Sequence, residues 1–173
     1  MAHKTASTIF FEIQQFRNHW FWQLLLLAPF SYFCGVLAYQ LYSGKFVGDH
    51  PASNFDLALL LLFYGSIAYF ALFYVKLTTV ISAEKISYGW NLPSAQLNEI
   101  KVEDIQSCEL VTYHFVGYGY RFSLKYGRVY NVWGNKGLLI IMKNGKKIML
   151  GTNSTKHLKS AINQIPLLNQ QAS

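Results

Sequence analysis

The C-terminal part of this chain lacks negative charge. All eight Asp and Glu residues precede Leu110, whereas nine of the fifteen Lys and Arg residues follow it. An excess of this kind is typical of nucleic-acid-binding surfaces, and equally of segments that stay on the cytoplasmic side of a membrane. The composition of the rest of the chain distinguishes nucleic-acid binding from a location on the cytoplasmic side of a membrane.

Charge of either sign is missing from two long apolar segments. Residues Trp20–Tyr42 and Leu57–Val75 contain no Asp, Glu, Lys or Arg. A helix needs about 20 mostly apolar residues to cross roughly 30 Å of hydrocarbon, and both segments meet this requirement. The sequence therefore predicts a transmembrane helical hairpin within residues 20–76, with spans at about 20–42 and 57–76. Because neither span carries a charged residue, no ion or proton pathway is expected.

Lys and Arg are scarce in the loop between the two spans. The loop has only Lys45, whereas Lys4 and Arg17 precede the first span and Lys76 and Lys85 follow the second. Cytoplasmic segments carry the excess of Lys and Arg, so both termini are expected in the cytoplasm. The basic C-terminal segment agrees with this orientation. Its charge is thus interpreted first as a sign of topology, and nucleic acid is not expected as a partner.

Cysteine pairs and catalytic constellations are also missing. Cys34 lies in an apolar segment and Cys108 in the polar part, so both are interpreted as free thiols. The five histidines are scattered without metal-ligand spacing. The sequence contains no phosphate-binding loop and no nucleophile elbow. We therefore expect no enzyme, no cofactor and no metal site.

The segment before the first span, residues 1–19, has helical periodicity. Ile9, Phe10, Ile13 and Phe16 recur at the spacing of one helix face. This pattern predicts an amphipathic helix at the membrane interface, or the first turns of the span itself. The sequence does not separate these two alternatives.

After Lys76 the pattern changes to short β-type segments separated by turn residues. Asn144-Gly145 between two apolar segments is the strongest short hairpin signal. Residues 155–165 have the periodicity of an amphipathic helix that ends before Pro166. A domain of about seven strands and a C-terminal helix is therefore predicted at 77–166, followed by a tail at 167–173. The predicted strands lie at 77–82, 86–90, 108–115, 120–126, 128–133, 138–143 and 146–150, and a further short segment at 99–102 precedes a single predicted helical turn at 103–106.

This plan resembles the pleckstrin-homology-like (PH-like) domain of bacterial membrane proteins. Four stretches are similar to a family of small bacterial proteins with two spans and a C-terminal domain of this kind: residues 11–16, 117–121, 133–138 and 145–152. Tyr118 stands where that family has tryptophan. The resemblance implies an α+β protein of the bacterial inner membrane, in which the hairpin precedes a PH-like β-sandwich or partial barrel. It implies no activity, ligand or catalytic residue.

Basic residues on the predicted strands and on the hairpin turn are the candidate binding residues. PH folds generally bind anionic headgroups through such residues, each worth about 1 kcal/mol near a membrane surface. Basic cytoplasmic segments need no ligand to explain them, so plain solvated charge is the first interpretation of these residues. As a functional interpretation, diffuse contact with anionic phospholipid is favoured over recognition of one headgroup. The candidates for lipid contact are Arg121, Lys125, Arg128, Lys143, Lys146 and Lys147.

These features predict a membrane-anchored binding or scaffolding protein at the cytoplasmic face. Its domain recruits a protein partner through an exposed groove or sheet edge, while the basic face contacts anionic lipid. The alternative is a structural subunit of a homo- or hetero-oligomeric membrane assembly. Cross-linking separates the two, because a scaffold captures unlike proteins and an oligomer captures itself.

Overall fold

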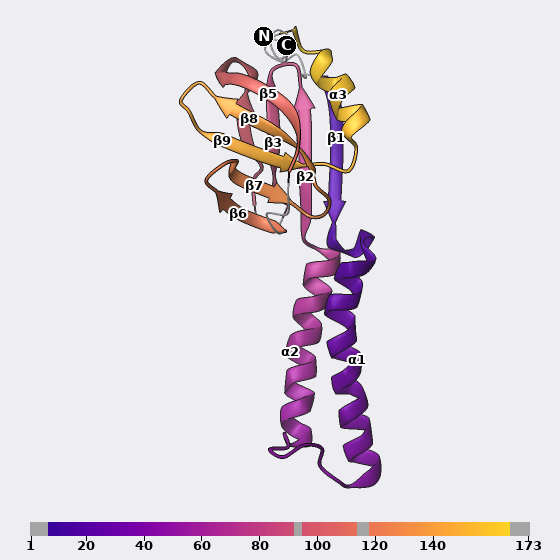
Figure 1. Ribbon diagram of the computed structural model, residues 1–173. Helices are drawn as coiled ribbons and strands as arrows, with labels where there is room; N and C mark the ends of the chain where they lie inside the picture. The colour runs from indigo at the N-terminus through magenta and orange to yellow at the C-terminus, as the bar shows by residue number, and fades with distance from the viewer. Residues whose placement is uncertain (1–6, 92–94, 114–117, 167–173) are drawn as a thin grey trace. The chain divides into compact units, whose positions relative to one another are not determined.

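The computed structural model describes residues 7–91, 95–113 and 118–166 (Figure 1). The chain divides into two compact units, one formed by Gln15–Val75 and the other by the residues before and after that segment. The predicted tail 167–173 lies outside the described residues, as does the Phe115 end of the predicted strand 108–115.

The helical unit contains the two predicted spans. A short 3-10 helix, η1 (Phe16–Asn18), precedes α1 (Trp20–Ser43), and α2 (Asn54–Phe73) follows. Both long helices are long and apolar enough to cross a membrane, and most of their side chains are not buried within the protein. The two helices are therefore compatible with a membrane protein.

Local sequence signals set the ends and the packing of these helices. Ser53 caps α2, because its hydroxyl oxygen accepts a hydrogen bond from the Asp56 N–H at 3.1 Å. Gly44 ends α1 in the left-handed region at φ +65°. Between the helices, Gly65 leaves room for the Phe30 ring, since a Cβ at Gly65 would lie 2.8 Å from that ring. A small residue here lets α1 and α2 approach closely.

The segment before α1 is a strand, so the helical prediction for it is wrong. Thr8–Gln15 forms β1, in which Phe10, Glu12 and Gln14 are buried and Phe11 and Ile13 are exposed. Side chains of a strand alternate between two faces, and this alternation is present. It was hidden in the sequence because polar residues occupy the buried face and apolar residues occupy part of the exposed one.

The β unit contains nine described strands in two sheets, which together with the helices make an α+β fold. The first sheet has the order β1-β2-β3-β4 and the second β5-β8-β9-β7-β6, in which only the β7–β9 pairing is parallel. The strand and helix predictions after Lys76 are confirmed, with shifted ends. The elements are β2 (Lys76–Ser82), β3 (Lys85–Asn91), β4 (Asn98–Lys101), η2 (Val102–Asp104), β5 (Ile105–Thr112), β6 (Gly119–Ser123), β7 (Gly127–Asn131), β8 (Lys136–Met142), β9 (Lys147–Gly151) and α3 (Thr155–Asn163).

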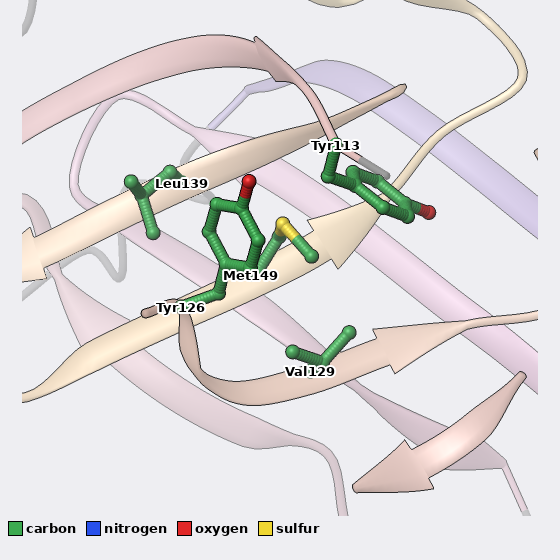
Figure 2. Close-up of a cluster of buried hydrophobic side chains, with 5 residues drawn as sticks. All are labelled: Tyr113, Tyr126, Val129, Leu139 and Met149. Carbon is green, nitrogen blue, oxygen red and sulfur yellow. The ribbon is translucent and has the colours of Figure 1, made fainter. Parts of the chain in front are cut away.

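In the second sheet, apolar residues lie on both faces, and the strand register shows which of them share a face. Val129, Met149 and Leu139 form one row across β7, β9 and β8. Figure 2 shows this row together with Tyr113 and Tyr126, the other members of the same buried cluster. Residues next in sequence point to the opposite face. The sheet is therefore packed on both faces.

The opposite face of the second sheet turns toward the first sheet. Tyr130, Leu150 and Leu138 form its cross-strand row, and Leu150 and Leu138 are almost fully buried. The Tyr130 ring contacts Tyr88 of β3, with 5.2 Å between ring centroids. This contact joins the two sheets through their inner faces.

Hydrogen bonds tie β1 to the segment that follows β9. The buried Glu12 carboxylate accepts from the Thr152 hydroxyl at 2.6 Å and from the Asn153 N–H at 2.9 Å. The Gln14 amide donates to the Gly151 carbonyl at 2.7 Å. Two of the stretches that carry the family resemblance, 11–16 and 145–152, therefore meet in the folded protein.

Replacing Glu12 by Ala is expected to lower the free energy of unfolding by about 2–3 kcal/mol, because it leaves the buried Thr152 hydroxyl and the partly buried Asn153 N–H without an acceptor. Urea unfolding of the full chain in mild detergent, followed by near-UV circular dichroism, measures this loss. Glu103→Ala is the control, since Glu103 forms an exposed ion pair with Lys101 at 3.2 Å, worth at most about 1 kcal/mol. Equal losses for the two variants would contradict the role given to Glu12.

Candidate functional site

Three of the six predicted basic residues line one concave site, which we call the basic concavity. It has a volume of about 380 Å³. Its residues come from three places in the second sheet: the end of β6 and the turn after it, the start of β7, and the turn into β9. They are Phe122, Leu124, Gly127, Arg128, Gly145, Lys146, Lys147 and Ile148.

The turn between β8 and β9 positions Lys146 and Lys147. The Gly145 N–H donates to the Met142 carbonyl at 2.8 Å, and the Met142 N–H donates to the Lys146 carbonyl at 2.9 Å. Gly145 has φ +78°. The predicted hairpin is confirmed, but its loop has three residues, with glycine in the left-handed position that such loops require. The returning strand begins at Lys147, one residue after the predicted start, and Lys146 directly precedes it.

A close approach at Gly127 brings the other side of the concavity into place. Gly127 has φ +70°, and a Cβ on it would overlap the carbonyl oxygen of Lys147. Only glycine allows the start of β7 to approach the start of β9 so closely. In the resulting register Arg128 lies directly beside Ile148. The cations of β7 and β9 are thus brought to one surface by backbone contact.

Exposure rises across the inner face of the sheet toward β6. Ile140, Ile148, Arg128 and Phe122 are successive cross-strand neighbours. Ile140 is fully buried and Ile148 is 5% exposed, whereas Phe122 is 72% exposed. The apolar face that forms the core between the sheets therefore continues outward into the concavity.

Two tyrosines lie on the same inner face, in the cross-strand row next to that of Phe122 and Arg128. Tyr120 on β6 is exposed, and its ring lies 5.0 Å from that of the buried Tyr130. Burial, with a smaller contribution from Tyr130, raises the pKa of Tyr88 to about 12, although the Arg128 guanidinium acts in the opposite direction. Burial is also the main cause that raises the pKa of Tyr130. Both phenols are neutral at physiological pH and add no negative charge beside Arg128.

The electrostatics of the concavity are purely positive. None of its lining residues carries a carboxylate. Within the described parts of the chain, the ion pairs are Lys85–Glu99 and Lys101–Glu103, both at the first sheet and η2. The positive charges of the basic concavity are therefore available to an anionic ligand or surface.

The other three predicted basic residues lie outside the concavity. Lys125 is exposed in the β6–β7 turn, with its ammonium 5.2 Å from the centroid of the Tyr126 ring. Lys143 is exposed in the β8–β9 turn. Arg121 is half-buried and donates to the carbonyl of Tyr118. Lys125 and Lys143 thus lie on the two turns that supply concavity residues, whereas Arg121 is engaged with its own strand.

The sequence reasoning missed the apolar members of the site, Phe122 and Leu124. Residues 120–126 were predicted as one strand, which would have made Leu124 an ordinary strand residue. In the structure β6 ends at Ser123, and Leu124 is 96% exposed in the turn. The signal that was available is Gly127, because a glycine in a short strand connection often marks the left-handed position that ends a turn.

The two cysteines form no disulfide, and the buried one is unreactive. Both are free thiols. Burial, with a smaller contribution from Glu109, raises the pKa of the Cys108 thiol to about 12. A buried thiol of this kind stays protonated and unreactive at physiological pH. Among the described residues, no group of three or more His, Cys, Asp and Glu is arranged to hold a metal ion.

The chain matches no protein-family model, and no curated protein or solved structure is significantly similar to it. The resemblance to the bacterial PH-like family therefore remains a prediction. Function has to be inferred from the two apolar helices and from the residues of the basic concavity.

Proposed function

We propose that this chain is a membrane-anchored binding protein of the bacterial inner membrane. The α1–α2 hairpin anchors it, and a PH-like β domain at the cytoplasmic face contacts anionic phospholipid through the basic concavity and recruits a protein partner. The observation that carries this proposal is the concavity itself, in which Arg128, Lys146 and Lys147 surround apolar side chains without any carboxylate.

The energetics favour an orienting role for the lipid contact. Each Lys or Arg near an anionic surface contributes about 1 kcal/mol, so three residues supply about 3 kcal/mol. This is a weak attachment alone, and it fades beyond a Debye length of about 8 Å. The hairpin already holds the domain at the bilayer, so the concavity serves to set which face of the domain meets the lipid.

The edge of the second sheet supports the recruitment of a protein partner. β6 is the terminal strand of that sheet, and its Tyr120, which lies beside Tyr130, is 57% exposed. A terminal strand can pair with an extended segment of another protein, and exposed aromatic side chains are common anchors in protein interfaces. This edge is the surface through which we propose that a partner is held.

Charge reversal in the concavity tests the lipid contact. The protein for this test joins residues 7–15 to 76–173 through a short Gly-Ser loop, which keeps β1. Replacing Arg128, Lys146 and Lys147 together by Glu is expected to lower binding to equimolar phosphatidylglycerol–phosphatidylcholine vesicles by about a hundredfold or more, since about 3 kcal/mol or more is lost. Vesicle sedimentation at several salt concentrations measures the change.

The matched control reverses three exposed lysines elsewhere, Lys136, Lys156 and Lys159. Lys136 begins β8, the end of that strand opposite to the β8–β9 turn. The control variant has the same net charge as the concavity variant. Better vesicle binding by the control variant would therefore show that the position of the charges matters, and not only their number. Equal binding by the two variants would show that the attraction does not depend on the concavity and would overturn the proposed contact through it.

Cross-linking of the full chain in native membranes tests the partner part. A binding protein is expected to give cross-links from the Tyr120 position to unlike proteins. Cross-links only between copies of this chain would favour the alternative, a structural subunit of an oligomeric assembly. The two outcomes differ in mass, so mass spectrometry of the products separates them.

A further inference from the structure

We propose that Leu124 and Phe122 form an apolar wedge that enters the bilayer beside the basic concavity. This inference rests on the proposed lipid contact and adds a distinct element to it, because it assigns a depth of insertion as well as a charge attraction. Leu124 is 96% exposed and Phe122 is 72% exposed, and both line the concavity. The occupant of this surface is an anionic bilayer.

The turn that carries Leu124 is held in place by its neighbours. The Tyr126 N–H donates to the Ser123 hydroxyl oxygen at 3.4 Å. The Tyr126 ring points into the buried cluster beside Met149 and Leu139 (Figure 2). In the same turn, the Leu124 side chain is almost fully exposed. The wedge is therefore preformed, and its insertion has a small ordering cost.

Charge selects the occupant of this surface. The wedge is surrounded by Lys125, Arg128, Lys146 and Lys147, and the concavity has no carboxylate. A second copy of the same surface would bring like charges together, which costs several kcal/mol in an interface. An anionic bilayer instead accepts all of these cations at its headgroups while the apolar side chains go deeper.

The shape of the wedge also favours a bilayer over a protein. Leu124 projects from a turn, so a protein partner would need a preformed pocket to receive it, whereas lipid chains rearrange around any small apolar group. Full burial of a leucine side chain yields about 1.5–3 kcal/mol. A single exposed leucine is common on protein surfaces and does not by itself indicate a binding site. Leu124 continues the apolar surface of Phe122 and Ile148 within a purely cationic rim, and this combination is what lipid insertion requires.

Depth measurements on the full chain test the wedge. A nitroxide label is attached at Leu124→Cys in a Cys34→Ala background and placed in nanodiscs of equimolar phosphatidylglycerol and phosphatidylcholine. Cys108 is kept, because its buried thiol does not react. The label at position 124 is expected to be accessible to oxygen and protected from a water-soluble nickel complex. The matched labels at Asn144→Cys, on the other turn, and Lys156→Cys, on α3, are expected to stay accessible to nickel.

A second experiment moves the label from position 124 to position 125, so that the effect of the Leu124 side chain itself is measured. With the label at Lys125→Cys, the additional change Leu124→Ser is expected to shift the ratio of immersed to water-exposed label about tenfold or more toward water, the equivalent of at least 1.4 kcal/mol. Phe11→Ser, an exposed aromatic of β1 outside the concavity, is the control and is expected to leave the ratio unchanged. An unchanged ratio for Leu124→Ser would overturn the wedge.

The remaining outcomes distinguish insertion of the wedge from the charge contact of the proposed function. They also distinguish a bilayer from a second copy or a protein partner as the occupant of this surface. Immersion that persists in pure phosphatidylcholine would support the wedge and contradict the charge contact. Loss of binding on charge reversal, without immersion at position 124, would keep the charge contact and overturn the wedge. Dipolar broadening between labels would identify a second copy as the occupant. Protection of position 124 only in native membranes would identify a protein partner, and either result overturns the wedge.

Discussion

A chain that begins at Lys76 is expected to lose the cooperative unfolding transition of the β unit, although it contains every strand that the sequence predicts. The missing piece is β1, which lies before the two helices in sequence and beside β2 in the first sheet. Its removal takes the buried Phe10 out of the unit and leaves Thr152 and Asn153 without the Glu12 carboxylate.

The size of this loss follows from what β1 buries. Phe10 is 6% exposed, and burying a phenylalanine side chain contributes about 1.5–3 kcal/mol. The contacts of the Glu12 carboxylate add about 2–3 kcal/mol, and the strand pairing and Gln14 add to this. Small domains are stable by about 5–15 kcal/mol in total. Loss of β1 therefore removes a large part of the stability of the unit, and we expect it to unfold.

Thermal unfolding followed by near-UV circular dichroism checks this expectation. The control joins residues 7–15 to Lys76 through a short Gly-Ser loop, a connection that Figure 1 permits because β1 and β2 are neighbours that run in opposite directions. This joined chain is expected to unfold cooperatively. An equal unfolding midpoint for the chain that begins at Lys76 would show that β1 is dispensable. A separate drop caused by Glu12→Ala in the joined chain would attribute part of the effect to the carboxylate.

Gly127→Ala is expected to lower the free energy of unfolding by about 2–5 kcal/mol. An alanine at φ +70° costs about 1–2 kcal/mol of backbone strain. The added Cβ overlaps the carbonyl oxygen of Lys147, which cannot move without breaking the parallel pairing of β7 and β9. Overpacking of this kind costs a further 1–3 kcal/mol, approximately.

Gly145→Ala is the matched control for this prediction. Gly145 has a similar backbone angle, φ +78°, but nothing lies within 4 Å of the position of its Cβ. The control therefore reports the backbone strain alone, about 1–2 kcal/mol. Urea unfolding of both variants measures the difference, which is the cost of the overlap. Equal losses would show that β7 and β9 can separate without penalty, and Gly127 would then have no special part in forming the concavity.

The sequence predicted those features that depend on neighbouring residues. Two uncharged segments of sufficient length predicted the helices, and Asn144-Gly145 predicted the hairpin. Strands separated by turn residues were recognisable because alternation and turn preferences are local properties. The charge asymmetry was visible at once, since the sequence after Leu110 contains no acid.

The missed features depend on residues that are distant in sequence. The sequence predicts a helix where β1 lies, because the buried face of this strand includes Glu12, and that face is explained only by Thr152, 140 residues later. The gathering of Arg128 with Lys146 and Lys147 depends in the same way on the parallel pairing of β7 with β9. No local pattern reports which strand will lie beside which.

The sequence by itself thus determined the two apolar helices, most of the strands and the acid-free basic character of the C-terminal part. The tertiary structure alone decided that β1 belongs to the β unit, which basic residues share a surface, and that Leu124 is exposed beside them. The physical reason is that hydrophobic length, alternation and turn chemistry act over a few residues, whereas strand order and burial are set by the packing of the whole unit.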